Sequence, residues 1–517
     1  MLSFLTCFSK RRKPQSPWKE IEEAARDLES RPSWNAPENT LLLEAFEWHL
    51  PDDQGHWRRL RQGLSGWKEM GIDQIWIPPG CKAMNASGNG YDIYDLYDLG
   101  EFDQKGSRAT KWGSRRELEE LVMDAQALDM GVYWDAVLNH KAGADYPERF
   151  EAVAVDPHRR NVAVSKPVEI AGWTGFDFAG RGDRYSAMKY HWSHFNGVDW
   201  DDARRENGIF RVADKTWASD VGQEHGNYDY LMFANLDYSH PAVREDVLRW
   251  GTWICQQLPL RGMRLDAAKH FSTAFQREFI AHVRQTNPDL RVIGEYWSGD
   301  LTELLGYLKQ MDYGVMAVDV PLVINLSRTS HTKGADLREI FTGTLVQSQP
   351  DHALTFVSNH DTVPGQMLET PVAPSFKPLA YALVLLRKEG HPCVFYGDLY
   401  GTLGDKPLPR ACDGQLPILT RARKLYAYGE QQDYFDQANC IGFVRYGDAR
   451  HSGLACVLSN GTTAEKRMYV GRKHARQPWT DLLHDRDSVV IDASGYGVFP
   501  VDGMSVSVWI PASDRVD

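Results

Sequence analysis

The sequence predicts an α/β fold: a (β/α)8 TIM barrel with an inserted domain after its third strand and an antiparallel β-sandwich domain at its C-terminal end. Eight short apolar segments alternate with segments of helical periodicity, as in parallel barrels. More than 100 residues separate the third strand candidate, which ends at His140, from the fourth, near Gly262. Short alternating strands with turn signals follow residue 419.

The first strand–helix–strand unit opens the barrel. LLLEAFEWHL (41–50) is strand-like, and apolar residues then recur at helical spacing through residues 56–71. IDQIWIPP (72–79) follows as a buried strand. This succession predicts two parallel strands joined by a helix.

A capping box predicts the start of the next helix: Ser114 is followed three residues later by Glu117. We expect Gly131 to end the helix and GVYWDAVLNH (131–140) to form the third strand. The five further strand candidates are 261–267, 290–297, 314–321, 353–361 and 392–398.

These elements predict four regions along the chain. An N-terminal extension, with a helix from Trp18 to about Leu28, precedes the barrel. The predicted boundaries are 1–37 for the extension, 38–140 and 241–418 for the barrel, 141–240 for the inserted domain, and 419–517 for the all-β domain.

Composition disfavours a nucleic-acid partner and a membrane-spanning segment. The formal net charge of −12 disfavours nucleic acid, because phosphate binding requires clustered Lys and Arg. The longest apolar run, residues 379–386, is too short to cross a bilayer. Aromatic residues make up 11% of the chain and offer flat faces that stack on sugar rings, although we expect most of them in the core.

Cysteine usage predicts a cytoplasmic protein. The seven cysteines are an odd number and include no C-x-x-C pair. The N-terminal sequence MLSFLTCFSKRRK places its apolar stretch before its basic cluster, the reverse of a secretory signal. Cys7 beside that cluster raises the alternative of a lipidated membrane contact through the N-terminal tail, but we favour a solvated tail.

Three carboxylates follow strand candidates: Asp266 after GMRL, Glu295 after RVIG and Asp361 after TFVSNH. In a barrel of this kind the C-terminal ends of the strands face one pocket, so residues distant in sequence meet there. Any one of these acids alone would be read as a helix cap or a loop ion pair. The three together, with their neighbours, favour a catalytic site.

Four motifs carry a family resemblance: DAVLNH (135–140), GMRLDAAKH (262–270), GEYW (294–297) and FVSNHD (356–361). With these in the expected order, the chain resembles the α-amylases of glycoside hydrolase family 13, in particular the bacterial liquefying and the intracellular fungal α-amylases. The resemblance extends from about residue 40 to about residue 511.

The resemblance implies a role for each acid. Asp266 would attack the anomeric carbon, Glu295 would act as general acid and then base, and Asp361 would bind sugar hydroxyls. Retaining hydrolysis needs two carboxyl groups about 5 to 5.5 Å apart, one ionised and one protonated, which neighbouring strands can supply.

Further side chains are expected in the same pocket. Arg264 lies two residues before Asp266 on the same strand, so we expect it to face the same way and to hold the nucleophile ionised. The resemblance implies that the substrate is also bound by His140 and His360 through hydrogen bonds, by Tyr91 through stacking, and by Lys269 and His270 on the leaving-group side.

The resemblance also implies calcium, with a departure. Asn139, Asp229 and the carbonyl of His270 match the relatives' ligands, but Asn235 stands where a second Asp is expected. Fewer anionic ligands weaken a calcium site, so we expect at most one weakened site. We expect no further calcium or sodium ions. At their positions stand Asn196, Ala218 and Ser239.

The predicted function is endo-hydrolysis of α-1,4-glucosidic bonds in starch, glycogen or maltooligosaccharides, by a monomer without an organic cofactor. Transfer of the glycosyl group to a second sugar (4-α-glucanotransferase activity) remains an alternative, because both reactions use the same motifs. A non-catalytic glucan-binding protein is the alternative of a different class, and the three intact acids disfavour it. No G-x-G-x-x-G or P-loop motif lies between a strand and a helix, which disfavours a nucleotide-dependent enzyme.

Overall fold

The computed structural model describes residues 39–516. The predicted N-terminal extension, including the helix from Trp18 and the tail that carries Cys7, lies outside the described residues. Among residues 39–516, no helix is both long and apolar enough to cross a membrane.

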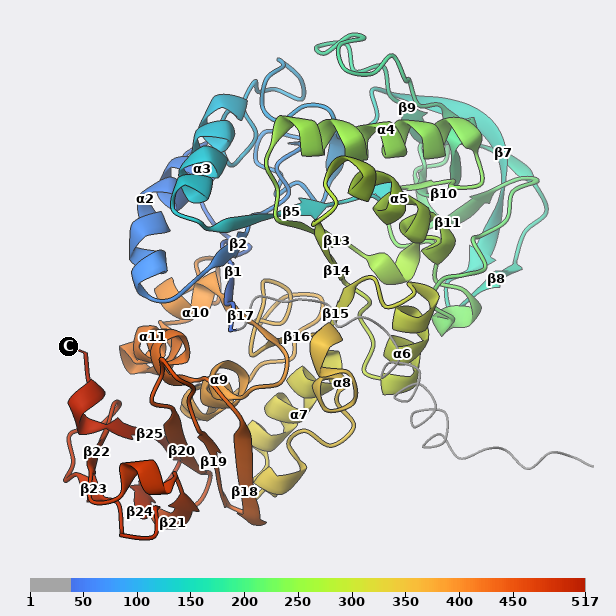
Figure 1. Cartoon of the computed structure of the whole chain (residues 1–517). Helices are drawn as coiled ribbons and strands as arrows, with labels where there is room; N and C mark the ends of the chain where they lie inside the picture. Colours follow the sequence, from blue (N-terminus) through green and yellow to red (C-terminus); the bar gives the residue numbers. More distant parts are fainter. Residues whose placement is uncertain (1–38, 517) are drawn as a thin grey trace, which may run out of the picture. The chain divides into compact units, whose positions relative to one another are not determined.

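Eight parallel strands close into a barrel at the centre of Figure 1, in the order β1-β17-β16-β15-β14-β13-β5-β2. All eight predicted segments supply one strand each, which confirms the predicted barrel. The strands are shorter than the apolar segments, because most segments continue into a loop at the C-terminal end. Segments 314–321 and 392–398 instead run into helices that begin at Val320 and Tyr396. Their bounds are β1 Leu42–Glu44, β2 Gln74–Trp76, β5 Gly131–Ala136, β13 Gly262–Leu265, β14 Arg291–Gly294, β15 Met316–Val318, β16 Ala353–Phe356 and β17 His391–Phe395.

Helices surround the barrel and bury their apolar faces against it. In α2 the apolar residues at helical spacing, Leu60, Leu64 and Trp67, are buried, and Met70 just after the helix is half-buried. The predicted capping box is present at the start of α3, which ends at Ala127, before Gly131. The helices are α2 His56–Glu69, α3 Arg115–Ala127, α4 Pro241–Gln257, α5 Thr273–Thr286, α6 Leu301–Gln310, α7 Val320–His331, α8 Leu345–Ser348, α9 Lys377–Leu386, α10 Tyr396–Tyr400 and α11 Leu416–Tyr426.

An antiparallel sheet interrupts the barrel between β5 and α4, as predicted from the long gap. Its order is β6-β12-β10-β11-β7-β8, with β9 paired to β7. Val153, Val155, Trp217 and Tyr230 form a small core on it. The strands are β6 His140–Lys141, β7 Tyr146–Asp156, β8 Arg159–Ala163, β9 Val168–Gly175, β10 Phe195–Asp201, β11 Glu206–Val212 and β12 Ala234–Leu236. A hairpin, β3 Lys82–Ala83 and β4 Ile93–Asp95, precedes α3.

The C-terminal part is a β-sandwich. A six-stranded antiparallel sheet, β18-β19-β20-β25-β22-β23, and the β21-β24 ladder enclose one core that includes Val457, Met468, Phe499 and Trp509. The strands are β18 Gln431–Gln437, β19 Cys440–Arg445, β20 Leu454–Ser459, β21 Ala464–Tyr469, β22 Pro478–Asp481, β23 Val489–Val490, β24 Tyr496–Val501 and β25 Ser505–Pro511. The predicted domain boundaries stay predictions; the one after residue 140 falls within β6, and the one after residue 418 falls within α11.

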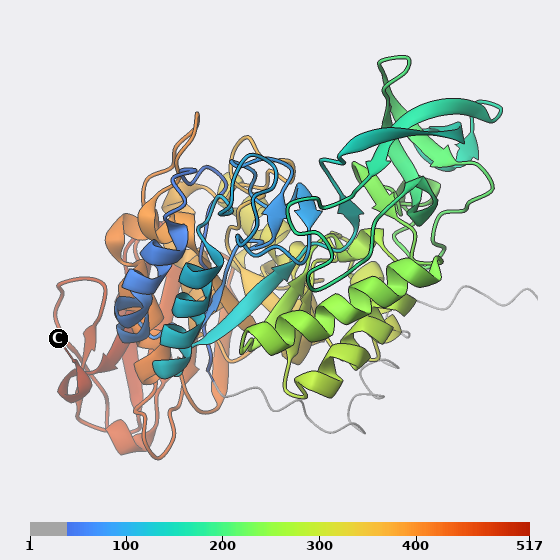
Figure 2. The same cartoon turned by 90° about the horizontal axis from the view of Figure 1, so that it is seen from above.

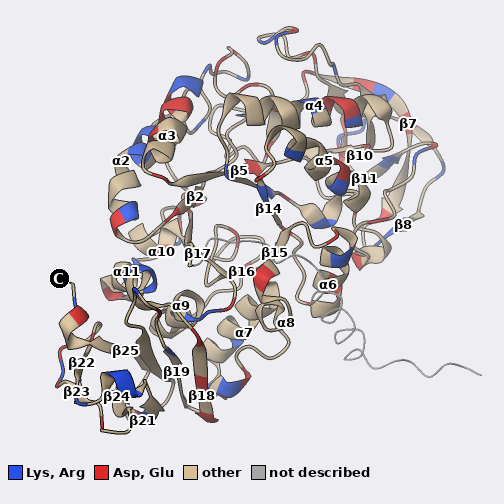
Figure 3. Ribbon diagram, viewed as in Figure 1, with Lys and Arg blue, Asp and Glu red and all other residues tan. Residues whose placement is uncertain are grey.

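Figure 2 shows the inserted sheet and the C-terminal sheets at opposite sides of the barrel. Along the ribbon of the outer helices in Figure 3, positions of Lys or Arg are interspersed with positions of Asp or Glu. Arg61 of α2, for example, contacts both Glu120 and Asp124 of α3. These exposed pairs contribute little to stability, so the barrel depends mainly on its apolar layers.

Candidate active site

The three predicted acids stand after strands that end at the same face of the barrel. Asp266 and Glu295 directly follow the neighbouring strands β13 and β14, and Asp361 lies in the loop after β16. Ala267 adopts a left-handed conformation with φ of 50°, and its N–H donates to Glu295 Oε2 at 2.8 Å. The turn after β13 thereby orients the acid on β14.

One guanidinium links the two acids. Arg264 Nη1 lies 2.8 Å from Asp266 Oδ1, and Arg264 Nη2 lies 2.6 Å from Glu295 Oε1. A third carboxylate, Asp135 on β5, contacts Arg264 Nη1 at 2.7 Å. The Arg264 side chain is 1% exposed, so water screens these contacts weakly. Three carboxylates therefore share a single buried cation.

Burial governs the protonation of Asp266 and Glu295. It raises the pKa of Asp266 well above its usual range, against the opposing effect of Arg264, and Glu295 adds to the increase. Burial likewise raises the pKa of Glu295. Two carboxyl groups at one cation in a buried site cannot both ionise cheaply, so the pair favours holding one proton. Arg264 acts in the predicted direction, but it does not outweigh burial and the negative neighbours.

Asp361 differs from the other two acids, because a cationic ring accompanies it. Burial opposes its ionisation, but the charge of the neighbouring His360 lowers the pKa of Asp361 below its usual value. His360 Nε2 lies 3.2 Å from Asp361 Oδ2. Asp361 is therefore ionised at neutral pH and can accept hydrogen bonds from a ligand.

Tyr91 and His140 form an aromatic wall beside the acids. The Tyr91 hydroxyl donates to Asp135 Oδ2 at 2.9 Å, and its ring is stacked with those of Trp48 and His360, at centroid distances of 5.7 and 5.2 Å. His140 Nε2 lies 2.8 Å from the Tyr91 carbonyl. Burial lowers the pKa of His140 to about 4, so the imidazole is neutral at pH 7.

Lys269 and His270 follow Asp266 in a short turn, Ala268–His270, and contact the inserted segment. Lys269 Nζ lies 2.5 Å from Glu224 Oε1 and donates to the Trp297 carbonyl at 3.0 Å. His270 Nδ1 lies 2.8 Å from the Tyr228 carbonyl, and burial lowers the pKa of His270 to about 3. Both side chains are buried next to the site and connect it to residues 224–228.

Two residues at the site were not predicted from the sequence. Asp135 holds Arg264 and Tyr91, and Glu44 at the end of β1 contacts His360. Asp135 opens the DAVLNH motif, and Glu44 is a charged residue inside an apolar strand. The position of Glu44 could have been recognised from the sequence, because a carboxylate buried in a strand requires a partner.

The predicted calcium ligands lie where the inserted sheet meets the barrel. Asp229 Oδ2 accepts a hydrogen bond from Asn196 Nδ2 at 2.7 Å, and Asn235 Nδ2 donates to Asn196 Oδ1 at 2.9 Å. The Oδ1 atoms of Asn139 and Asn235 are buried and have no hydrogen-bond partner among the described residues. Such oxygens suit a hard cation.

The donor set nevertheless carries little negative charge. Among residues 39–516, no three His, Cys, Asp or Glu side chains gather as a metal site. Burial raises the pKa of Asp229 to about 7, despite its hydrogen bonds from Ala218 and Asn196. The residues present therefore fit a calcium ion, to which they offer one carboxylate and neutral amide oxygens as ligands.

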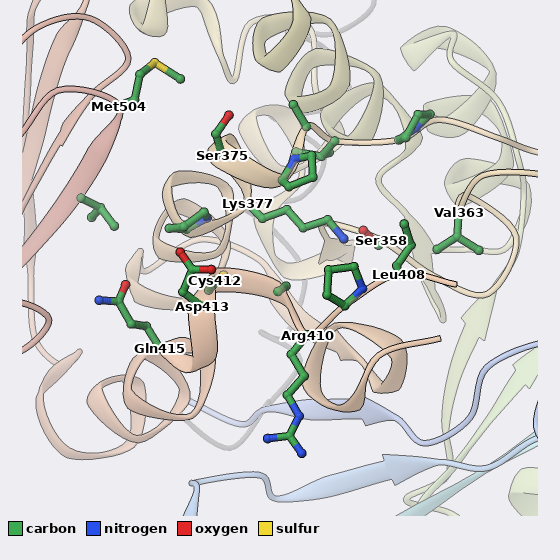
Figure 4. A pocket seen from close by; sticks show the side chains of 18 of the residues that line it. Ser358, Val363, Ser375, Lys377, Leu408, Arg410, Cys412, Asp413, Gln415 and Met504 are labelled. Atoms are coloured by element: carbon green, nitrogen blue, oxygen red, sulfur yellow. The ribbon is translucent and has the colours of Figure 1, made fainter. Parts of the chain in front are cut away.

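Two cavities of about 450 Å³ flank the site. One lies on the inserted sheet next to β6 and is lined by Trp173 and Trp200. The other lies between the loop after β16 and the C-terminal sheet. Figure 4 shows Lys377 extending toward Ser358 there, and the lining includes several prolines and no Trp, Tyr or Phe. Only the first cavity offers flat rings to a sugar.

Comparison with known proteins identifies the family. The α-amylase catalytic-domain model matches residues 41–479. The α-amylase of Bacillus licheniformis is 46% identical over 91% of this chain and 93% of its own length, and the cytoplasmic α-amylase of Escherichia coli K12 is 40% identical over 91% and 99%. The crystal structure of an α-amylase from Geobacillus thermoleovorans with acarbose has a TM-score of 0.61 at 19% identity, covering 91% of this chain and 97% of that one, which shows the shared fold. The chain therefore belongs to the α-amylase family, glycoside hydrolase family 13.

Proposed function

We propose that this protein hydrolyses internal α-1,4-glucosidic bonds of starch, glycogen or maltooligosaccharides with retention of configuration. The observation that carries the proposal is the Arg264 guanidinium, which contacts both Asp266 and Glu295 at the ends of neighbouring strands. A retaining mechanism requires a nucleophilic carboxylate and a proton-donating carboxyl group close together, and two acids that contact the same guanidinium meet that requirement. The name of the B. licheniformis relative, α-amylase, agrees with this substrate class.

In the first step, ionised Asp266 attacks the anomeric carbon while Glu295 transfers its proton to the glycosidic oxygen. The bond to the leaving sugar breaks, and a covalent glycosyl-enzyme forms. Burial leaves the pair with one proton, which lies on Glu295 when this step begins, and Arg264 stabilises the ionised Asp266. Asp361 and His360 would bind the hydroxyls of the sugar that reacts.

In the second step, Glu295 accepts a proton from water, and the resulting hydroxide attacks the anomeric carbon. The bond to Asp266 breaks and releases the second product. Tyr91, stacked on His360, would support the sugar ring. Lys269 and His270 would contact the leaving-group side, where they already connect β13 to the inserted segment.

Longer substrates would reach the inserted sheet. Trp173 is 42% exposed at the cavity on that sheet, and Trp200 lines the same cavity. Exposed indole rings favour sugar faces, because they offer a large apolar surface at little cost in ordering. This cavity therefore supports a substrate of several glucose units.

The assignment is tested by reducing-end release from soluble starch with wild type, Glu295→Gln and the surface control Glu339→Gln. We expect Glu295→Gln to lose at least a thousandfold in kcat, the upper part of the range for a general acid/base, and the control to match wild type. Equal background from wild type and Glu295→Gln would instead indicate a non-catalytic glucan-binding protein. Mass spectrometry with maltopentaose distinguishes transfer, since only transfer gives products longer than the substrate.

We also infer one weak calcium site, a monomeric state and a cytoplasmic location. Asn139, Asp229 and the carbonyl of His270 would hold the ion between the barrel and the inserted sheet, where it would act structurally. The printed name of the E. coli relative supports the cytoplasmic location. Light scattering on the purified chain tests the monomer, and fractionation of the source cells tests the location.

A further inference from the structure

We propose that Glu44 is a positioning residue that fixes His360 as an imidazolium, so that one ring nitrogen donates to Glu44 and the other donates toward Asp361 and the bound sugar. The inference deepens the proposed function and rests on it. It concerns a carboxylate that lies inside the barrel and touches neither catalytic acid.

Glu44 is the last residue of β1, and its side chain is 1% exposed. Its Oε1 lies 2.5 Å from His360 Nδ1 and accepts the backbone N–H of His360 at 3.3 Å. Both contacts come from one oxygen. They hold the ring and the backbone of His360 against β1, a strand that is far away in the sequence.

The second ring nitrogen of His360, Nε2, points to the site. His360 Nε2 lies 3.2 Å from Asp361 Oδ2 but has no well-aligned hydrogen-bond partner among the described residues. An N–H at this position can therefore turn to a ligand hydroxyl and still stabilise the charge of Asp361.

Aromatic neighbours leave the ring little freedom. His360 is stacked with Tyr91 and Trp48, at interplanar angles of 6° and 2°. Phe46 and Trp76 also pack around the ring, tilted and edge-on, with centroids 5.0 and 5.9 Å away. Packing thus sets the orientation of the ring, and the contact with Glu44 keeps Nδ1 protonated.

The charges around the ring favour the imidazolium. Burial opposes it, but Asp361 and Glu44 outweigh burial and raise the pKa of His360 well above its usual value. The groups that face His360 or Glu44 from the surrounding elements are Asp361, Glu295 after β14, Arg264 on β13, Tyr91 and Cys393 on β17. Of the two cations that face this cluster, Arg264 is already shared by three carboxylates, so Glu44 depends on His360.

Glu44→Gln removes the charge and keeps the shape. The amide oxygen can still accept from Nδ1, but His360 then loses its second proton at a lower pH. A neutral ring with its proton on Nδ1 turns a lone pair toward Asp361 and cannot donate to a sugar hydroxyl. We expect the alkaline limb of kcat/KM to move about one pH unit or more to lower pH, a change that corresponds to about 1.4 kcal/mol between the protonation states.

The direct test is ¹⁵N NMR of the ring nitrogens in protein labelled at histidine, with the His360 signals assigned from a His360→Gln variant. Between pH 5 and 9 we expect wild type to keep both His360 nitrogens protonated and Glu44→Gln to titrate within that range. Glu47→Gln is the matched control, since Glu47 is another buried carboxylate in the same segment that contacts His49 rather than His360. It should leave the His360 signals unchanged.

Identical His360 titrations in wild type and Glu44→Gln would overturn the proposal, and so would an equal shift in Glu47→Gln. The NMR measurement needs no turnover, so it stands apart from the starch assay. If wild type releases no reducing ends while its His360 titration depends on Glu44, the proposed activity fails and the local role of Glu44 remains. An active wild type with an unchanged titration gives the reverse result.

Discussion

Two buried polar clusters of this protein solve the problem of a buried carboxylate in opposite ways. At the barrel, Asp135, Asp266 and Glu295 share the charge of Arg264. At the inserted sheet, Asp229 is surrounded by amide donors from Asn196 and the Ala218 backbone.

The first arrangement suits a reactive site, and the second suits a structural contact. Three carboxylates at one cation leave a proton to be exchanged, which suits acid/base chemistry. Amide donors instead satisfy the hydrogen bonding of a carboxylate without supplying a full opposite charge. The contact between the inserted sheet and the barrel therefore depends less on a bound cation than it would if aspartates replaced the amides.

The largest effect is expected where the shared cation is removed. Arg264→Ala should lower kcat by about a thousandfold or more, because it removes a preorganised charge from the reacting centre. Arg264 lowers the pKa of Asp266, so its loss raises that pKa and moves the acidic limb of the pH profile to higher pH. Steady-state kinetics on maltooligosaccharides measures both. The exposed Arg277→Ala serves as control, and a loss below tenfold would contradict the shared-cation interpretation.

A smaller effect is expected from Asp135→Asn. The amide can still bind Arg264 and the Tyr91 hydroxyl, but it no longer carries charge, so the guanidinium is held less firmly. We expect kcat to fall about 10- to 100-fold, in the range of a partner that orients another group. Circular dichroism should show an intact fold. Unchanged kinetics would mean that Asp266 and Glu295 alone position Arg264.

The amide cluster can be converted into a more charged one. Asn235→Asp restores a second carboxylate beside Asp229, so calcium affinity should rise by about tenfold or more. Without calcium the same variant should melt at a lower temperature than wild type, because two buried carboxylates repel each other. Calorimetric titration and thermal melts in calcium and in chelator measure these effects. Equal affinity in both proteins would show that the amides do not limit binding.

The smallest effect is expected at an ion pair of the inserted sheet, where Lys215 Nζ lies 2.6 Å from Asp237 Oδ2. Burial opposes ionisation of Asp237, but Lys215 and Ser239 lower its pKa. Because the folded pKa is lowered, this stabilisation is present above the unfolded pKa and is lost as pH falls through the folded value. Lys215→Met should therefore cost about 1.5 kcal/mol at pH 7 and less below pH 3. Urea unfolding at the two pH values measures the difference, and a cost independent of pH would contradict it.

The sequence by itself determined the barrel, its order and its three acids. Helical and strand periodicity are local patterns, so all eight strand segments could be located without knowledge of their partners. The acids could be assigned to one end of the barrel, because its parallel strands end at a common face. The capping box at Ser114 likewise needs only residues that are close together in the chain.

Only the tertiary structure decided which groups share a proton or a charge. Arg264 was expected to hold Asp266 ionised, yet the pairing of β13 with β5 and β14 also brings it into contact with Asp135 and Glu295. Glu44 and His360 are 316 positions apart and meet because β1 lies near the loop after β16. Electrostatic pairing depends on distances of a few ångströms between remote segments, and periodicity carries no information about those distances.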